Sequence, residues 1–272
     1  MKAIACVNLK GGVGKTAISV NLAAYCGSRN LKTLLVDLDP QTNATFSCIE
    51  VDVWEDHASR KGTVANLLDM RSNTNAEGST KDVHSVILKD VFPNVDLIPS
   101  HLDLFTIDLD LAATTARETK LRRALQPIAD DYDIIICDCP PNLTIPTQNA
   151  LALCTHYLVP ISPDYLSGVG VSLLLSRVKR FCLEMEHHLE FAGIVISRVG
   201  RPAAHREETV TALRQTFKDD VLISELKERV AVSMAAAKKK AIYGSTDADA
   251  IAEFKSMSEE VLRKMGINHE NT

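Results

Sequence analysis

The stretch of sequence that decides the fold is KGGVGKT at Lys10–Thr16, which lies between an apolar run, Ala3–Asn8, and a helical stretch, Lys15–Cys26. Glycines let the backbone N–H groups of such a loop curl around phosphate oxygens, and the start of the following helix adds partial positive charge. A strand, a glycine loop and a helix in this order are typical of a site for nucleotide phosphates. We therefore expect an anion site at the carboxyl end of the first strand.

The lysines and the threonine of this stretch carry its chemistry. Lys15 is expected to reach the β- and γ-phosphates, and the hydroxyl of Thr16 is expected to ligate Mg²⁺. The usual spacing places glycine where Leu9 stands, so the loop is a variant with a second lysine, Lys10, before the glycines. A plain glycine turn beside a lysine is the alternative, but it does not account for the acidic residues downstream. The residues expected around the nucleotide are Lys10, Gly11, Gly12, Val13, Gly14, Lys15, Thr16 and Ala17.

Carboxylates follow two other apolar runs and complete the predicted site. Asp138 comes directly after IIIC, so it lies at the ligand-binding edge of an open α/β sheet, where a carboxylate can hold Mg²⁺ through water. Asp37 and Asp39 follow LLV on one face of a strand end, because side chains alternate along a strand. We expect Asp39 to orient the attacking water. For Asp37, a metal contact and structural support of the turn are equal alternatives.

Short β-branched runs alternate with helical stretches along the chain. This alternation predicts an α/β fold with a mostly parallel, doubly wound sheet flanked by helices, and one domain over residues 1–272. The polar stretches Glu50–Gly62 and Arg71–Asp82 are expected to be surface loops, and Trp54 to pack locally rather than to anchor a partner. The expected strands are Ala3–Asn8, Thr33–Asp37, Val95–Pro99, Asp133–Cys137, His156–Ile161 and Phe191–Ser197. The expected helices are Lys15–Cys26, Thr63–Met70, Arg117–Ala129, Pro146–Cys154, Val169–Leu183 and Glu207–Phe217.

Composition excludes several classes of protein. The 272 residues are 46% hydrophobic and carry a formal charge of −5, which excludes a disordered tail and a histone-like basic protein. Aromatic residues make up only 5%, fewer than a stacking platform for single-stranded nucleic acid usually needs. Seven cysteines without zinc-ligand spacing, and no apolar run of the length of a membrane span, predict a reduced cytosolic protein.

The combined motifs resemble those of the ParA/MinD family of deviant Walker ATPases, and within it the small ParA (Soj-like) partition proteins. The resemblance begins with KGGVGKT, DLDPQ and IIICDCPP. It continues through NALALCTHYLVPISPDYLSGVGVSLLL and ERVAVSMAAAKKKAI, and so covers essentially the whole chain. It implies a P-loop ATPase that uses ATP and Mg²⁺.

The resemblance also implies a mechanism. Members form nucleotide-sandwich dimers in which the lysine before the glycines, here Lys10, crosses to the partner's nucleotide, much as an arginine finger does. Lys15 then binds phosphates within its own subunit, Thr16 and Asp138 serve Mg²⁺, and Asp39 supports hydrolysis. Such dimers bind DNA without sequence preference, and a ParB-like or adaptor protein stimulates hydrolysis and releases them. The implied location is the cytoplasm, on the nucleoid.

This chain departs from the family pattern at a few positions. Ala17 replaces a second threonine after the P-loop, with little expected loss, and Asn142 stands where many relatives have serine. The residues near Arg198 and near Arg229 are implied to approach the adenine base, although their surroundings match the family only loosely.

Positive charge is concentrated toward the C-terminal half. Residues 176–240 hold 13 Lys and Arg against 9 Asp and Glu, a local charge of +4. An acidic chain can still bind DNA if such cations gather on one face and dimerisation doubles them. The candidates for phosphate contact are Arg177, Lys179, Arg180, Arg201, Arg206, Arg229, Lys238, Lys239 and Lys240.

Two other functions remain as alternatives. A MinD-like membrane-associated regulator would use a C-terminal amphipathic helix, but here the terminal apolar stripe is expected to pack on the domain. A P-loop enzyme that uses ATP to activate a metabolite would be expected to have an insertion for its substrate, and none stands out. The stripe consists of Phe254, Met257, Val261 and Leu262.

Overall fold

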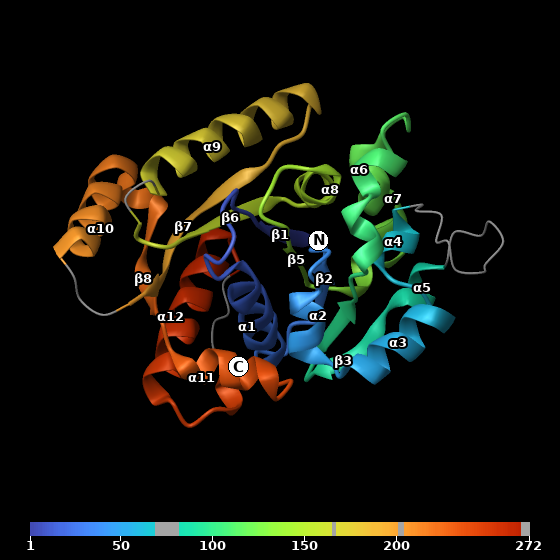
Figure 1. Ribbon diagram of the computed structural model, residues 1–272, viewed down its shortest axis with the longest axis horizontal. Coiled ribbons are helices and arrows are strands. Elements are labelled where there is room, and N and C mark those ends of the chain that lie inside the picture. Colours follow the sequence, from blue (N-terminus) through green and yellow to red (C-terminus); the bar gives the residue numbers. More distant parts are fainter. Residues whose placement is uncertain (69–81, 165–166, 201–203, 268–272) are drawn as a thin grey trace.

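Eight strands form one sheet in the order β3-β4-β2-β5-β1-β6-β7-β8 (Figure 1). The structure is a computed structural model that describes residues 1–68, 82–164, 167–200 and 204–267. Every neighbouring pair of strands is parallel except β3 and β4. The predicted mostly parallel sheet is confirmed. The strands are β1 (Lys2–Cys6), β2 (Thr33–Asp37), β3 (Leu88–Phe92), β4 (Val95–Ile98), β5 (Ile134–Asp138), β6 (His156–Ile161), β7 (Glu190–Val199) and β8 (Val221–Lys227).

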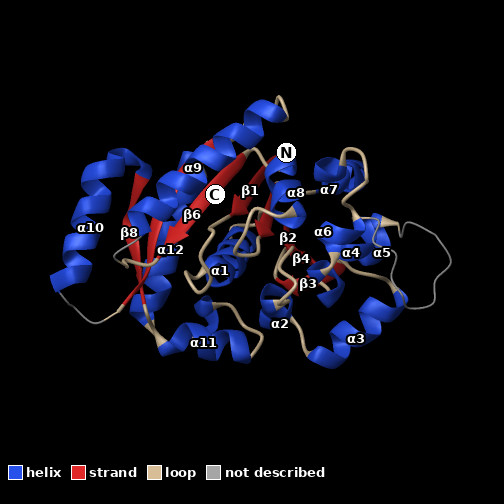
Figure 2. Ribbon diagram, turned by 45° about the horizontal axis from the view of Figure 1, so that its top comes forward, coloured by secondary structure: helices blue, strands red, loops and turns tan. Residues whose placement is uncertain are grey.

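Helices cover both faces of the sheet (Figure 2). On one face, α1 and α12 bury apolar side chains together with α2, and on the other face α7, α8 and α9 do so. The longer helices are α1 (Lys15–Ser28), α3 (Val51–Arg60), α8 (Ile145–Leu153), α9 (Ser167–Glu184), α10 (Ala204–Phe217), α11 (Val230–Ala237) and α12 (Ala248–Lys264). The short ones are α2 (Asn43–Cys48), α4 (Val64–Leu67), α5 (Val83–Val86), α6 (Ile107–Asp110) and α7 (Lys120–Leu125). Five 3-10 turns complete the described elements: η1 (Leu102–Phe105), η2 (Arg117–Thr119), η3 (Gln126–Asp131), η4 (Lys218–Asp220) and η5 (Ile242–Gly244).

The inner strands match the sequence expectation most closely. Every residue of β2, β5 and β6 is buried. A strand covered on both faces needs apolar side chains on both, so it is visible as a continuous apolar run. Thr33–Asp37 and His156–Ile161 therefore have the predicted bounds.

Elements at the periphery differ from the prediction. The expected loop Glu50–Gly62 contains helix α3, which has no buried residue; its apolar side, with Val51, Trp54 and Ala58, spans only ten residues rich in charge and was not recognised as a helix. Strands β3 and β8 were not predicted, because both lie at sheet edges and expose charged residues among apolar ones. In the second expected loop, Arg71–Asp82, only Asp82 lies within the described residues. The end of the expected helix Thr63–Met70 also lies outside them.

The C-terminal stripe packs on the core, as predicted. Its members in α12 are 0–5% exposed and pack beside α1, on the same face of the sheet. Among the described residues, no helix combines the length and the apolar character needed to cross a membrane. All described strands belong to one sheet, while the assignment of the whole chain to a single domain stays a prediction.

The strand order brings the predicted site together. Strand β1 lies between β5 and β6, and β2 lies on the other side of β5. In the parallel register, Cys6 and Asp37 are both paired with Asp138. The phosphate loop and the acidic strand ends therefore share the carboxyl edge of the sheet, where open α/β sheets bind ligands.

Candidate functional site

The phosphate loop turns on two glycines with left-handed backbone. Gly12 has φ 74° and Gly14, which caps α1, has φ 84°. A side chain at either position would be strained. Helix α1 begins at Lys15, directly after Gly14, so its first N–H groups face the loop. This is the anion-binding geometry that KGGVGKT predicts.

Lys15 lies beneath the loop. Its side chain is buried, and Nζ donates to the carbonyl of Lys10 at 3.1 Å and to that of Asn8 at 3.5 Å. These bonds hold the ammonium group inside the curve of the loop. The position suits a cation that contacts the terminal phosphates of a nucleotide.

Thr16 and Asp138 meet beside the loop. The Thr16 hydroxyl donates to Oδ2 of Asp138 at 2.8 Å, and the Ser19 hydroxyl donates to Oδ1 at 3.0 Å. Burial raises the pKa of Asp138 above its usual range, although these two hydrogen bonds lower it. A hydroxyl and a carboxylate at the edge of a phosphate loop are oxygen donors of the kind that Mg²⁺ accepts, so the pair fits that ion.

No set of protein ligands could hold a metal alone in the parts of the chain that the structure describes. No group of three or more His, Cys, Asp or Glu there has an arrangement that could hold a metal ion. Mg²⁺ is usually bound through one or two protein oxygens together with phosphate oxygens and water.

Asp37 and Asp39 have different surroundings. Asp37 is fully buried, and its carboxylate accepts bonds from the Thr45 hydroxyl (2.7 Å), the Thr45 N–H (2.8 Å) and the Asp39 N–H (3.1 Å). Burial and the charge of Asp138 raise the pKa of Asp37. These bonds favour structural support of the turn, and a metal contact of Asp37 stays a prediction. Asp39 accepts from the Gln41 N–H at 2.9 Å and lines the cavity described next.

A cavity of about 830 Å³ opens at this edge of the sheet. One wall is the phosphate loop with Lys15, Thr16 and Asp39. Ala17 belongs to the floor, and residues 226–230 and helix α11 form the far wall. The volume lies within the range of small-molecule sites, so the cavity can hold a whole nucleotide.

The end of β7 is tied to the loop. The Ser197 hydroxyl donates to the carbonyl of Val13 at 2.5 Å. Arg198 donates to the carbonyl of Gly12 at 2.7 Å and to the Glu228 carboxylate at 2.6 Å. Arg198 therefore joins the phosphate loop to the segment after β8 and lines the cavity, while its contact with a nucleotide stays a prediction.

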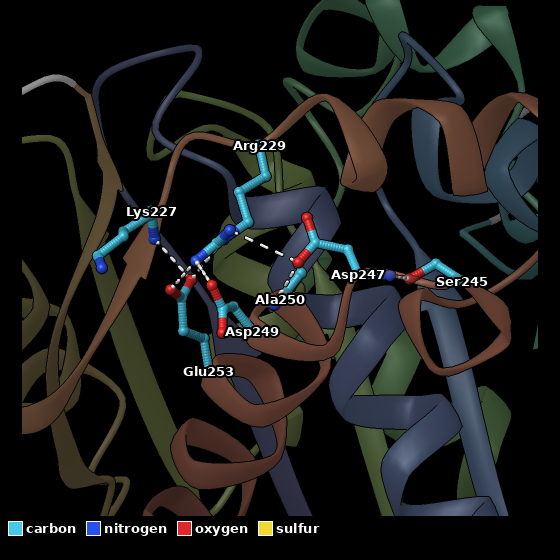
Figure 3. Close-up of polar contacts among 7 residues, drawn as sticks. All are labelled: Lys227, Arg229, Ser245, Asp247, Asp249, Ala250 and Glu253. Carbon is cyan, nitrogen blue, oxygen red and sulfur yellow. Dashed lines mark hydrogen bonds and ion pairs between the residues drawn. The ribbon is translucent and has the colours of Figure 1, made fainter.

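Arg229 is surrounded by carboxylates (Figure 3). Its guanidinium donates to Glu253 Oε1 at 2.7 Å and lies within 3.5 Å of Asp247 and Asp249. Glu253 also accepts from the Lys227 N–H at 3.0 Å, so the cluster ties the end of β8 to α12. Only 20% of the Arg229 side chain is exposed. We therefore leave Arg229 out of the DNA-contact set proposed below and place it in the wall of the cavity.

Lys10 stands outside the cavity at the tip of the loop. Its exposed side chain forms an ion pair with Asp164 at the end of β6. The pair lowers the pKa of Asp164, while burial slightly opposes this shift. The Lys10 ammonium group is thus exposed, is bound to a residue of another segment, and does not line the cavity.

The remaining cationic candidates form two separate groups. The first group, called the α9 cations, consists of Arg177, Lys179 and Arg180, and all three are exposed. The second group, called the 238–240 lysines, consists of Lys238, Lys239 and Lys240, which directly follow α11. Helix α9 packs on one face of the sheet and α11 on the other (Figures 1 and 2). Arg206 is half-buried with interactions of its own, and Arg201 lies outside the described residues.

Two serines of the site, Ser19 and Ser100, were not predicted from the sequence, whereas Ser197 stands beside Arg198 in the segment implied to approach the adenine base. Ser19 lies three residues after Thr16, on the same face of α1, so helical spacing could have identified it. Ser197 lies near the carboxyl end of β7, and Ser100 lies two residues beyond β4. The strand-end argument that selected the aspartates could have selected both serines, because they lie at the same edge of the sheet.

Comparison with known proteins agrees with this geometry. Residues 1–191 match a family model described as an AAA domain. The sporulation initiation inhibitor protein Soj of Bacillus subtilis (strain 168) is 31% identical over 241 residues, 89% of this chain and 90% of that protein. The chromosome-partitioning ATPase Soj of Treponema pallidum (strain Nichols) is 33% identical over 234 residues, 86% of each chain. A solved structure is similar as well: a Borrelia burgdorferi B31 protein assigned to plasmid partition, with bound AMPPNP, has a TM-score of 0.79 at 25% identity and covers 97% of this chain and 99% of its own.

The fold and the site define a P-loop nucleotide-binding protein of α/β class. More narrowly, the chain belongs to the ParA/Soj-type family of P-loop ATPases, as its KGGVGKT, DLDPQ and IIICDCPP motifs predict.

Proposed function

We propose that this chain is an ATP-dependent dimerising switch that partitions or positions a plasmid, a chromosome or a protein cargo. In the ATP state the dimer binds DNA without sequence preference, and a ParB-like or adaptor protein stimulates hydrolysis and release. The observation that carries the proposal is the cavity that joins the phosphate loop, the Thr16–Asp138 pair and Asp39. A chain of this family with these groups around one cavity has the parts that ATP hydrolysis requires.

The residues act on the nucleotide as follows. Lys15 neutralises the terminal phosphates together with the N–H groups of Gly11, Gly12, Val13 and Gly14. Thr16 and Asp138 hold Mg²⁺, which when bound offsets charge on the β- and γ-phosphates. Asp39 orients the water that attacks the γ-phosphate, because it lines the same cavity as Lys15 and Thr16.

Lys10 acts on the second nucleotide of a dimer. Its exposed ammonium group reaches outward from the loop, and its ion pair with Asp164 is of the exposed kind that contributes little energy. It can therefore leave Asp164 for the phosphate of a partner subunit without a large cost. In this position it stabilises charge on the transferring phosphoryl group.

DNA contact uses the exposed cations. The α9 cations and the 238–240 lysines are the two candidate surfaces, and a dimer doubles each of them. We place the protein in the cytoplasm, associated with the nucleoid. Binding should fall steeply with salt, because each neutralised phosphate releases counterions.

One experiment tests the switch as a whole. Size-exclusion chromatography and binding to random-sequence duplex are measured with ATP, with ADP and without nucleotide, for the wild type and Asp39→Ala. We expect ATP to produce a dimer that binds the duplex, and Asp39→Ala to remain in that state while the wild type slowly leaves it. Dimer formation without DNA binding, together with capture by anionic liposomes, would favour the MinD-like alternative. ATP turnover by a monomer that needs a small-molecule acceptor would favour the metabolite-activating enzyme.

A further inference from the structure

Ser100 is a fully buried residue whose three polar groups are all engaged. Its hydroxyl donates to the carbonyl of Asp39 at 2.7 Å, and its N–H donates to the Thr45 hydroxyl at 3.0 Å. Its carbonyl accepts the indole N–H of Trp54 at 2.9 Å. Ser100 thus connects strand β4, the segment between β2 and α2, and helix α3.

These bonds hold the segment from Asp37 to Asp39 at both of its ends. The Thr45 hydroxyl that accepts from Ser100 donates to Asp37 at 2.7 Å. At the other end, the carbonyl of Asp39 accepts from the Thr42 N–H at 2.8 Å as well as from Ser100. The Thr42 bond lies within the turn itself, whereas the Ser100 bond comes from the segment that follows β4. The turn is also tied to β5, because the Leu38 N–H donates to the carbonyl of Asp138 at 2.9 Å. Ser100 is therefore the group that fixes the Asp39 end of the turn from the β4 side.

We propose that Ser100 is a positioning residue for ATP hydrolysis, which sets the orientation of Asp39, and that Trp54 forms the outer end of the same hydrogen-bonded chain. This inference rests on the proposed function of Asp39. Without the Ser100 hydroxyl the turn keeps its internal bond to Thr42, so Asp39 remains near the cavity but loses its fixed direction. A small displacement of a group that orients a nucleophile slows the reaction without weakening nucleotide binding.

Trp54 provides a signal that reports on this chain of bonds. It is the only tryptophan of the protein, and its ring packs between Phe46 and His101, with centroids 5.5 Å from each. Movement of Asp39 on nucleotide binding shifts Ser100, and a shift of Ser100 changes the hydrogen bond and the stacking of the indole. Trp54 emission should therefore respond to nucleotide although Trp54 does not line the cavity.

The test compares Ser100→Ala with a matched control. Ser258 is also fully buried and donates its hydroxyl to a carbonyl, that of Phe254, at 2.7 Å, but it lies on α12. We expect Ser100→Ala to lower the kcat of ATP hydrolysis about tenfold with KM changed less than twofold, and Ser258→Ala to leave both near the wild type. A non-hydrolysable ATP analogue with Mg²⁺ should change Trp54 emission in the wild type and in Ser258→Ala, and at most half as much in Ser100→Ala.

The outcomes separate this inference from the proposed function. A wild type without ATP turnover would overturn the proposed function and the positioning role together. A wild type that hydrolyses ATP, with equal kcat and equal emission change in Ser100→Ala, would overturn the positioning role alone. If Ser100→Ala does not fold, Trp54→Phe replaces it, because that change removes the N–H donor but keeps an aromatic ring. It should lower kcat about threefold at constant KM, and an unchanged kcat would refute the role of Ser100.

Discussion

Replacing Arg229 with alanine should destabilise the folded protein by about 2 kcal/mol. The guanidinium is 20% exposed and its main partner, Glu253, is 16% exposed, so both groups are largely shielded from water. A hydrogen bond between charged groups contributes about 1.5–3 kcal/mol in such places, and removing one partner leaves the other charge unpaired. The contacts with Asp247 at 3.5 Å and Asp249 at 3.4 Å are longer and add little. Loss of the Arg229 guanidinium should also loosen the end of β8, because the Glu253 carboxylate that it holds in place accepts the Lys227 N–H as well.

The assay is urea unfolding of the nucleotide-free protein, with Arg180→Ala as the control. Arg180 forms a bond of the same 2.7 Å length to Glu184, but its side chain is 77% exposed. Solvent screens such a pair, so its removal should leave the midpoint unchanged within error. In a thermal unfolding experiment, the midpoint of Arg229→Ala should lie about 5 °C below that of the wild type. The stability of Arg229→Lys should lie between the two, because lysine keeps the charge but not the planar guanidinium group. Equal stability of Arg229→Ala and Arg180→Ala would refute the argument from burial.

Four further changes test other parts of the structure. Lys15→Ala should abolish ATP binding measured by calorimetry. Lys10→Ala should bind ATP but form no dimer and show no stimulated turnover. Normal turnover by Lys10→Ala would exclude the action of Lys10 on a second nucleotide. Burial raises the pKa of Asp96, but hydrogen bonds from Lys89 and Tyr132 lower it below the usual value. Asp96 therefore stabilises the folded state at neutral pH. Its advantage over Asp96→Asn in urea unfolding should be constant above about pH 4, should shrink once the unfolded chain takes up the proton, and should vanish only when the pH has fallen through the lowered pKa of the folded state. Lys240 lines the cavity, so the test replaces only Lys238 and Lys239 with alanine. This change should weaken retention on duplex DNA at fixed salt without changing ATP binding, and unchanged retention would assign DNA contact to the α9 cations.

The sequence predicted those parts of the molecule whose residues stand next to one another along the chain. The phosphate loop is one continuous stretch, and Asp138 is marked by the apolar run before it. Helix α3 was not predicted, because its apolar period of Val51, Trp54 and Ala58 is short and lies among charged residues that are also typical of a surface loop. The bond of Ser100 to Asp39 joins residues 61 positions apart, and that of Ser197 to Val13 joins residues 184 apart. Only the strand order of the folded sheet brings such residues together.

The charge of the folded surface is smaller than the local count of +4 indicates. Arg198, Arg214 and Arg229 belong to that count, yet each is bonded to a carboxylate of the same or a neighbouring element. Lys218 and Lys227 are exposed as well, while Lys239 is 21% exposed and pairs with Glu50. The α9 cations and the 238–240 lysines lie on opposite faces of the sheet, so a flat stretch of DNA cannot contact both groups of one subunit in the same way. If each subunit of a dimer uses one group of three cations, about six phosphates are neutralised, and the logarithm of the binding constant should fall with the logarithm of salt with a slope of about −5. A slope near −10 would require both groups, and hence DNA that bends around the dimer or a second duplex.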